Sequence, residues 1–377
     1  MIIGIPKEIA VKGGLEEKRV SLSPAAVREL TSHGIQVLVE KSAGEGAHFS
    51  DDDYREAGAV VVYSKEEAYR RADLVVKVQV PLQEEWDFIK EDQVLFGFLI
   101  LGLSPPPLLD LILERHVLSI GMELVERDDG THPLQRPMSK IAGKMAPQIA
   151  GRLLQGNIKG GRGILLGGIE GVPPAEVVVL GGGTLGTGAA RSFKGLGCSV
   201  YVVDKDLRQL EKVSQEVPGT ITVSYNQRNL AKLASFADVL VAAVQVPGER
   251  TPVLVTREMV KTMRRGSVVI DFSIDQGGAV ETSRLTPTEE FSFNLDGVIH
   301  FAVPNVPSWV PRTSSHALSN AVLPYLLALA EDGWENALRQ LPELRRGVCT
   351  CEGYTTRLHL GEAGKGYQSI ETLLEGR

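Results

Sequence analysis

Short apolar runs rich in β-branched residues alternate with longer amphipathic stretches along the first third of the chain. Apolar runs of this length, bounded by turn residues, are typical of strands buried on both faces of a sheet. They predict strands at Ile2–Ile5, Ile35–Val39, Ala59–Val62, Leu74–Val78 and Val94–Leu101. The stretches between them predict helices, the first two after a capping serine, at Pro24–His33, Asp51–Ala57, Ser64–Arg71 and Leu108–Glu114. This alternation favours an α/β fold with a doubly wound parallel sheet.

The strongest local signal lies between Val177 and Asp204. The apolar run Val177–Leu180 leads directly into Gly181-x-Gly183-x-x-Gly186, a helix-compatible stretch, and a second apolar run that ends on Asp204. In a dinucleotide-binding βαβ unit the first glycine makes a tight turn, the second admits a pyrophosphate, and the third lets helix pack on strand. Glycines alone also occur in ordinary α/β turns. The order of strand, glycines, helix, strand and acid therefore predicts a dinucleotide site.

The pattern around this unit predicts a second doubly wound, Rossmann-like sheet. A long helix is expected at Ser139–Leu154, a glycine-rich crossover at Gly156–Gly171, and further strands at Val239–Val244 and Ser267–Phe272. The helices after Ser315 have no predicted strands of their own, so we expect them to return to the first domain. We predict a discontinuous substrate domain, residues 1–135 and 308–377, and a dinucleotide-binding domain, residues 136–307.

Composition narrows the class of protein. The chain has 377 residues, is 43% hydrophobic and 23% charged, and carries a formal net charge of −7, which fits a soluble enzyme and not a nucleic-acid partner. Its three cysteines form no Cys-x-x-Cys pair, so neither zinc nor a disulfide framework is expected. No apolar run approaches the length of about 18 residues that a membrane span needs. The N-terminal residues predict a strand and not a signal peptide, so we expect a cytoplasmic protein.

Several specific motifs are spread over almost the whole chain: Gly4–Glu8, Lys18–Val20, Leu74–Val78, Pro137–Gly143, Gly171–Ala175, Asp275–Gly278 and Pro311–Thr313. With these motifs the chain resembles the alanine dehydrogenase family, whose fold is shared with the NAD-binding subunit of proton-pumping transhydrogenase. The motifs at Ser139–Gly143 and Asp275–Gly278 favour the dehydrogenase branch of the family. The resemblance implies a homohexamer with its substrate site in a cleft between two domains.

The resemblance also implies roles for individual residues. Arg19 and Lys77 would bind the substrate carboxylate, one with two hydrogen bonds and the other with a compact positive charge. Lys77 and Asp275 would be the catalytic residues, and Gln135 and Asn305 would complete the substrate site. The expected cofactor contacts are Ser139, Gly181, Gly183, Thr184, Leu185, Gly186, Asp204, Val244 and Asn305. Because a carboxylate at Asp204 repels a 2′-phosphate, NAD is preferred to NADP, although Lys205 and Arg208 lie nearby.

The chain departs from the family at two places. Family members carry a catalytic histidine where this chain has Ile100, and a tyrosine where it has Phe98. Oxidative deamination needs a group that takes the ammonium proton, and isoleucine cannot carry one. His132 is a candidate replacement, against the alternative that it is a solvated loop histidine. Gln135 and Arg136 stand where alanine-binding relatives have small or apolar residues.

Two kinds of function remain open at this point. The first is an NAD-dependent amino-acid dehydrogenase, catalysing oxidative deamination or reductive amination of a small amino or 2-oxo acid other than plain alanine. In it, Lys77 with a pKa lowered by burial, or a water held by Asp275, would move the proton. An imine or opine reductase of the same family is a variant. The other kind is a catalytically silent, NAD-binding regulatory homologue. A transhydrogenase subunit with membrane partners is a further alternative.

Overall fold

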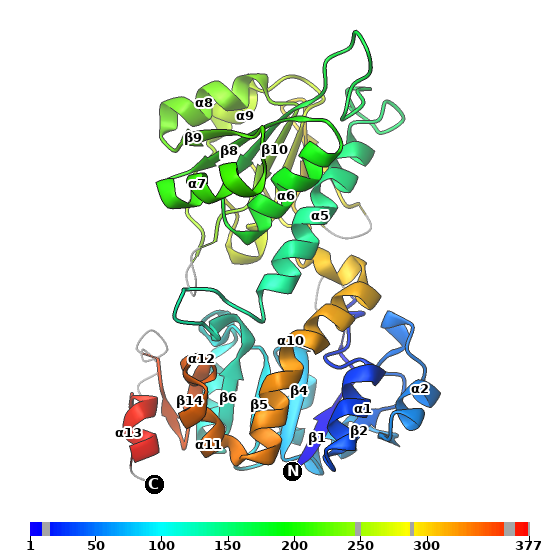
Figure 1. The fold of residues 1–377 in the computed structure, drawn as a ribbon, viewed down its shortest axis with the longest axis vertical. Helices are drawn as coiled ribbons and strands as arrows, with labels where there is room; N and C mark the ends of the chain where they lie inside the picture. The colour runs from blue at the N-terminus through cyan, green and yellow to red at the C-terminus, as the bar shows by residue number, and fades with distance from the viewer. Residues whose placement is uncertain (10–15, 246–249, 287–289, 358–365, 376–377) are drawn as a thin grey trace. The chain divides into compact units, whose positions relative to one another are not determined.

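The structure, a computed structural model, describes residues 1–9, 16–245, 250–286, 290–357 and 366–375. Contacts divide the chain into two compact units (Figure 1). The first unit contains Glu16–Met138 and Ser308–Arg377 together with the N-terminal strand, and the second contains Ser139–Pro307. Residues 10–15, which follow the N-terminal strand, lie outside the described residues. The first unit is discontinuous in sequence, because its last helices follow the second unit.

The first unit is built on a sheet whose described strands run in the order β15-β14-β6-β5-β4-β1-β2-β3. The strands from β1 to β6 are parallel, while β14 pairs antiparallel with β6 and β15 antiparallel with β14. Their bounds are β1 Ile2–Ile5, β2 Gln36–Glu40, β3 Val60–Val62, β4 Leu74–Gln79, β5 Val94–Phe98, β6 Leu118–Gly121, β14 Val348–Cys351 and β15 Tyr354–Thr355.

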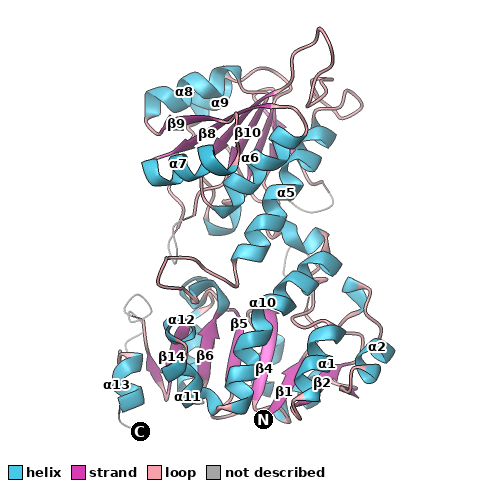
Figure 2. Cartoon of the chain, viewed as in Figure 1, coloured by secondary structure: helices cyan, strands magenta, loops and turns pink. Residues whose placement is uncertain are grey.

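Helices connect these strands and follow the last of them (Figure 2). Their bounds are α1 Pro24–Ser32, α2 Asp51–Glu56, α3 Lys65–Arg70, α4 Pro106–Glu114, α10 Pro311–Glu331, α11 Gly333–Gln340, α12 Pro342–Arg346 and α13 Ile370–Glu375. The predicted start signals are confirmed. The Ser23 side chain accepts the N–H of Ala26, and Ser50 forms a reciprocal capping box with Asp53.

The second unit has a sheet whose described strands run in the order β12-β13-β11-β10-β7-β8-β9, parallel except for β12. Their bounds are β7 Glu176–Leu180, β8 Ser199–Asp204, β9 Ile221–Ser224, β10 Val239–Ala242, β11 Val268–Asp271, β12 Phe293–Leu295 and β13 Val298–Phe301. The helices are α5 Arg136–Leu153, α6 Thr184–Gly195, α7 Leu207–Glu216, α8 Gln227–Phe236 and α9 Arg257–Thr262. Helix α5 begins in the first unit and continues into the second.

Both sheets reverse their strand order at one point. In the first sheet the reversal lies between β1 and β4, and in the second between β7 and β10. In open α/β sheets, ligands bind outside the carboxyl ends of the strands at such a reversal. The residues around the ends of β1 and β4 in the first unit, and of β7 and β10 in the second, are therefore candidates for ligand binding.

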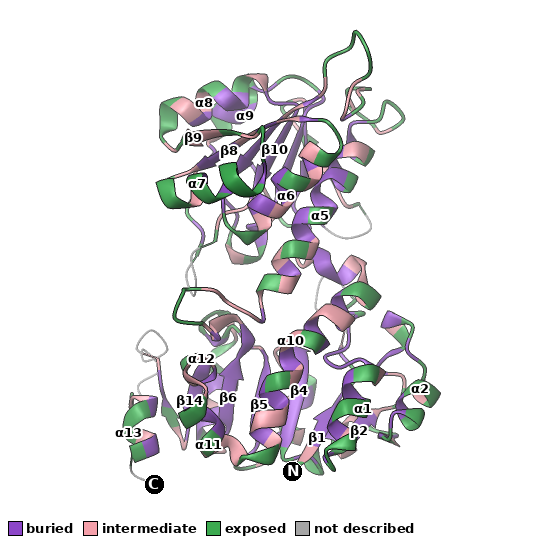
Figure 3. Ribbon diagram, viewed as in Figure 1, coloured by how far each residue is buried: buried purple, intermediate pink, exposed green. Residues whose placement is uncertain are grey.

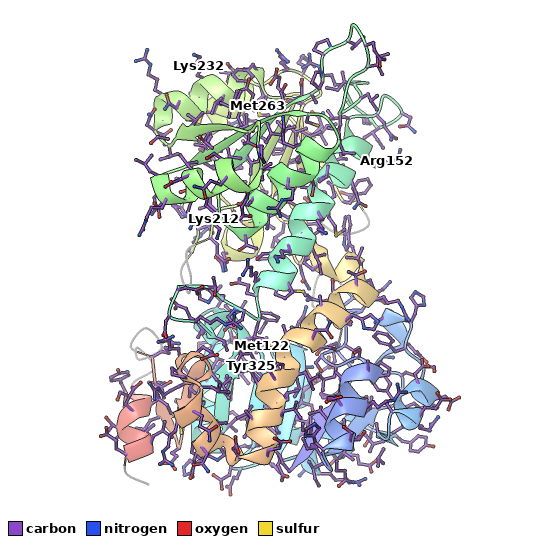
Figure 4. All side chains as sticks on the ribbon, in the orientation of Figure 1. Met122, Arg152, Lys212, Lys232, Met263 and Tyr325 are labelled. Atoms are coloured by element: carbon purple, nitrogen blue, oxygen red, sulfur yellow. The ribbon has the colours of Figure 1, made fainter. Side chains whose placement is uncertain are left out.

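The central strands are buried on both faces (Figure 3), which explains why they appear in the sequence as continuous apolar runs. Side chains fill the space between each sheet and its helices: Met122 is fully buried in the first unit and Met263 nearly so in the second (Figure 4). Lys212 on α7 and Lys232 on α8 are exposed. Within the described residues, none of the helices has the length and apolar character needed to cross a membrane.

The predicted fold class is confirmed, with two local corrections. The strand expected at Val94–Leu101 ends at Phe98, because Ile100 adopts a left-handed conformation and a 3-10 turn follows at Leu101–Leu103. The expectation that the last helices lack strands is wrong, since β14 and β15 extend the first sheet. Strand β14 does not show a continuous apolar run, because it contains Thr350. The Thr350 hydroxyl is 2.6 Å from the hydroxyl of Ser119 on β6.

Candidate functional site

In the glycine turn after β7, a side-chain Cβ would have room at one of the three glycines and would clash at the other two. Gly181 has a φ of +104°, and a Cβ there would lie 2.4 Å from the carbonyl oxygen of Ala243. A Cβ on Gly186 would lie 1.8 Å from the carbonyl oxygen of Gly181. At Gly183, the residue before α6, a Cβ would meet no atom within 4 Å. The turn therefore has the form that lets a phosphate reach the backbone at a helix N-terminus.

The carboxylate of Asp204, at the end of β8, is held beside this turn. Its Oδ2 accepts the N–H of Gly182 at 2.6 Å, and its Oδ1 accepts the N–H of Asp206 at 2.9 Å. Of the two nearby cations, Arg208 is paired with Asp206 at 3.1 Å, and its side chain is 90% exposed. The structure thus brings together the glycine turn and the acid that the sequence places after the second strand.

Helix α5 packs closely on the beginning of α6. A Cβ on Gly143 would lie 2.5 Å from the carbonyl oxygen of Leu185 and 2.9 Å from the nitrogen of Ala189. This approach explains the small residues on one side of α5. Ser139 lies one turn before Gly143 and so shares the helix face directed at α6. The predicted cofactor residues Ser139, Thr184 and Leu185 therefore belong to two helices packed against each other.

The segments after β10, β11 and β13 supply the other predicted residues of the second unit. The Ser273 hydroxyl donates to the carbonyl oxygen of Val244 at 2.8 Å and accepts its N–H at 3.2 Å. The exposed Asp275 follows, and its Oδ2 accepts the N–H of Asn305 at 3.1 Å. Asn305 has a φ of +52°, a conformation that asparagine tolerates well. Asp275 and Asn305 are thus in contact.

Lys77 lies in β4, beside the point where the first sheet reverses its order. Its Nζ is 2.8 Å from Oε1 of Glu85 and 3.1 Å from Oε2 of Glu8, and all three side chains are buried. Burial alone favours the neutral amine, but the two carboxylates outweigh it and raise the pKa of Lys77. The condition under which Lys77 could move the proton, a pKa lowered by burial, is therefore not met. This residue stays an ammonium and is not a proton acceptor.

Arg19 is also buried and is held by an acid two residues away. Its Nε donates to Oε1 of Glu17 at 2.8 Å and one terminal nitrogen donates to Oε2 at 2.6 Å. The other terminal nitrogen is 3.2 Å from the sulfur of Met138. Gln79, at the end of β4, donates to the same Glu17 carboxylate at 2.8 Å. The arginine is thereby fixed alongside the strand that carries Lys77.

Comparison with known proteins places this geometry in one family. Residues 4–142 match the model "Alanine dehydrogenase/PNT, N-terminal domain", and residues 146–357 match "Alanine dehydrogenase/PNT, C-terminal domain". The chain belongs to the alanine dehydrogenase/PNT family. The resemblance found from the sequence motifs is confirmed over nearly the whole chain.

Relatives within the family match at full length. The chain is 43% identical to "Alanine dehydrogenase" of Staphylococcus saprophyticus and 41% identical to "Alanine dehydrogenase 2" of Staphylococcus aureus, each over 100% of both chains. A solved structure titled "L-alanine dehydrogenase" matches with a TM-score of 0.89 and 39% identity, covering 96% of this chain and 99% of that one. The chain is therefore an oxidoreductase.

The fold of this chain is also found in a protein described as a transhydrogenase. The solved structure of a transhydrogenase from Sinorhizobium meliloti matches with a TM-score of 0.79, covering 95% of this chain and 99% of that one. Its sequence identity is only 23%, so this match concerns the fold alone. The higher identity to alanine dehydrogenases agrees with the branch that the motifs at Ser139 and Asp275 favour.

At the position that the family resemblance assigns to a histidine, Ile100 has an unusual backbone. Its φ and ψ are +40° and +49°, in the left-handed region, and its side chain remains 40% exposed. The carboxylate of Glu123 accepts the N–H groups of Ile100 at 2.8 Å and of Leu99 at 3.2 Å. Burial raises the pKa of Glu123 to about 7, although these N–H groups oppose the shift.

The segment before α5 carries two predicted residues, His132 and Gln135. The N–H of Arg136 donates to the carbonyl oxygen of His132 at 2.9 Å, so a helical turn already begins there. The His132 side chain is half-buried, and its Nδ1 is buried without a hydrogen-bond partner among the described residues. Gln135 is half-buried as well.

The sequence motifs do not reveal the acids that surround Arg19 and Lys77. Glu8 lies within the motif Gly4–Glu8, whereas Glu17 and Glu85 lie outside every motif. One signal was available, because a lysine inside a buried strand needs a partner of opposite charge. The sequence did not indicate which of the many glutamates would supply it.

Proposed function

We propose that the chain is an NAD-dependent amino-acid dehydrogenase that interconverts a small amino acid with its 2-oxo acid, acting as a homohexamer. The observation that carries the proposal is the full-length match to alanine dehydrogenases at 41–43% identity. Two local features support it: a glycine turn with a neighbouring acid in one unit, and buried arginine and lysine residues in the other.

The residues of the second unit fit NAD. The open space at Gly183 suits a pyrophosphate, and the first turn of α6 offers N–H groups to it. Asp204 is placed to accept the ribose hydroxyls and disfavours a 2′-phosphate. When bound, NAD supplies the hydride acceptor for oxidation of the amino acid. Ser139, Thr184, Leu185, Val244 and Asn305 are proposed to complete this site.

Arg19 and Lys77 are proposed to bind the substrate carboxylate. Both side chains are buried cations held in fixed positions by carboxylates, so they orient the substrate at little further cost in conformational freedom. Because Lys77 stays protonated, it does not act as the base. A water held by Asp275, or the imidazole of His132, is left to take the proton released from the substrate nitrogen.

The preferred side chain is proposed to differ from that of alanine. Ile100 and Phe98 present apolar surface where the resemblance places a histidine and a tyrosine, and Gln135 adds a polar group where alanine-binding relatives are apolar. The test is a panel of amino acids with NAD, and of 2-oxo acids with ammonium and NADH, followed by NADH absorbance. Turnover of alanine and pyruvate above every other pair would contradict the proposed preference. Absence of turnover throughout, with NAD still bound, would instead favour a silent homologue.

An imine or opine reductase is a second candidate, which Ile100 favours. Deamination requires water to add to the imine with help from a proton-carrying group, whereas reduction of a preformed C=N bond omits that addition. The same assay, with methylamine or an amino acid replacing ammonium, separates the two. Faster NADH oxidation with a primary amine than with ammonium would favour the reductase.

A further inference from the structure

Lys77 is the centre of a buried network of charges at the reversal point of the first sheet. Glu8 and Glu85 contact its Nζ, Lys65 lies 3.5 Å from Glu85, and Glu40 lies 3.9 Å from Lys65. Two lysines thus face three glutamates in this part of the described chain. With every group ionised, the network holds one excess negative charge before any substrate arrives.

Arg19, the arginine of the proposed substrate site, does not neutralise this excess negative charge. Arg19 is already matched by the carboxylate of Glu17, which contacts two of its nitrogens. Glu17 also lies near enough to Glu8 to disfavour the ionised form of Glu8. A substrate carboxylate that enters beside Lys77 and Arg19 therefore adds a negative charge to a buried group that already has a surplus. Like charges in such surroundings force one acid to take up a proton.

The contacts of each acid decide which carboxylate takes up the proton. Glu85 accepts hydrogen bonds from Lys77 at 2.8 Å, from the Tyr69 hydroxyl at 3.1 Å and from the Leu82 N–H at 2.8 Å, and its pKa is lowered. Glu17 is held by Arg19 at two points. These two carboxylates are well stabilised as anions.

Glu8 is the least stabilised of the acids that touch Lys77. Its Oε1 accepts the Val78 N–H at 2.6 Å and its Oε2 is 3.1 Å from Lys77. Complete burial raises its pKa, and Glu85 and Glu17 add to that effect. Glu40 also has a raised pKa, but it contacts Lys65 and the Lys7 N–H and has no direct contact with Lys77 among the described interactions.

We infer that Glu8 takes up one proton from solvent when a substrate carboxylate binds to Arg19 and Lys77. The inference rests on the proposed function, because it needs that carboxylate site. The proton forms an O–H bond on the Glu8 carboxylate, and no other bond is made or broken. Glu8 is thus a positioning residue that acts through Lys77. While the site is empty, the ionised Glu8 pairs with Lys77; when substrate binds, the protonated Glu8 leaves the charge of Lys77 to the substrate carboxylate.

Titration calorimetry on the full chain loaded with NADH tests this directly, using oxamate, an unreactive analogue of a 2-oxo acid. Binding heats at pH 8 are compared in phosphate and Tris, whose ionisation enthalpies differ, so that their difference counts the protons taken up. We expect about one proton per oxamate, and an affinity that falls roughly tenfold per pH unit where Glu8 is ionised in the empty site. Binding with no proton uptake would overturn the inference and leave the proposed function standing.

Variants assign the proton to its site. Glu8→Gln should bind oxamate without proton uptake and with little dependence on pH, whereas Glu40→Gln should still take up the proton. Glu66→Gln, an exposed acid on α3 outside the network, serves as the surface control. Proton uptake that persists in Glu8→Gln, or disappears only in Glu40→Gln, would overturn the assignment. If neither oxamate nor any 2-oxo acid of the panel binds the wild-type chain, the proposed function itself fails, and the inference with it.

Discussion

The N–H of Ile100 donates to Oε1 of Glu123 at 2.8 Å, and this bond helps to hold an isoleucine in a left-handed backbone conformation. That conformation costs an ordinary residue about 1–2 kcal/mol, and a β-branched side chain is among the least suited to it. Histidine and asparagine occupy it several times more often. The backbone at position 100 therefore suits the family's histidine better than the residue present.

Replacing Ile100 with histidine should improve both stability and alanine turnover. Relief of the backbone strain should raise the free energy of unfolding by roughly 0.5–1 kcal/mol. A group able to carry a proton near neutral pH should raise kcat for alanine by about 100-fold or more. Urea unfolding and NADH absorbance measure the two effects separately.

Ile100→Asn is the matched control, because asparagine relieves the same strain but cannot act as a base. It should show the gain in stability without the gain in turnover. A fall in stability in both variants would show that the isoleucine side chain contributes more by packing than its backbone costs. Equal turnover in both variants would exclude proton transfer at this position.

Glu123 should make stability depend on pH between about 4.5 and 7. Burial raises the pKa of this carboxyl from 4.5 to about 7 in the folded chain, so folding favours its protonated form. The stabilisation that Glu123 contributes is complete below pH 4.5 and is lost as pH rises through 7. This loss lowers the free energy of unfolding by up to about 3 kcal/mol. In Glu123→Gln this pH dependence should disappear. Urea unfolding at a series of pH values measures it, and an unchanged slope in the variant would contradict the assignment.

The sequence predicts an element of the fold when the residues of that element alone indicate its environment. The buried strand Leu74–Gln79 shows a continuous apolar run, and the helix at Pro24 shows its serine cap, so both were predicted. The strand Val348–Cys351 was missed because it pairs with a strand more than 200 residues earlier, through threonine and serine hydroxyls. Its stability comes from a partner that no local pattern reveals.

The candidate site divides in the same way. The glycine turn and Asp204 are close in sequence, so their spacing predicts their contact. The partners of Lys77 come from two other segments, around Glu8 and Glu85. The burial of Lys77 could be inferred from the sequence, while the carboxylates that raise its pKa could not.

Asp204→Ala should shift the cofactor preference toward NADP. Removing the carboxylate takes away two acceptors for the ribose hydroxyls, which should weaken NAD binding roughly 10- to 100-fold, and it removes the charge that repels a 2′-phosphate. Fluorescence titration with NADH and NADPH measures both affinities. Glu211→Ala, an exposed acid on α7, is the control for a general change in charge. Equal loss of affinity for both cofactors would contradict a role in discrimination.

His132→Asn should lower turnover while leaving substrate affinity nearly unchanged. The buried Nδ1 of His132 has no hydrogen-bond partner among the described residues, and the segment that carries it leads into Met138, whose sulfur contacts Arg19. Asparagine keeps a polar atom near the place of Nδ1 but does not titrate near neutral pH. If His132 moves the substrate proton, kcat should fall by about 100-fold with KM almost constant. His33→Asn, at an exposed imidazole that contacts Glu331, is the control. An unchanged kcat would leave a water held by Asp275 as the remaining route for the proton, and Asp275→Asn would then have to lower kcat.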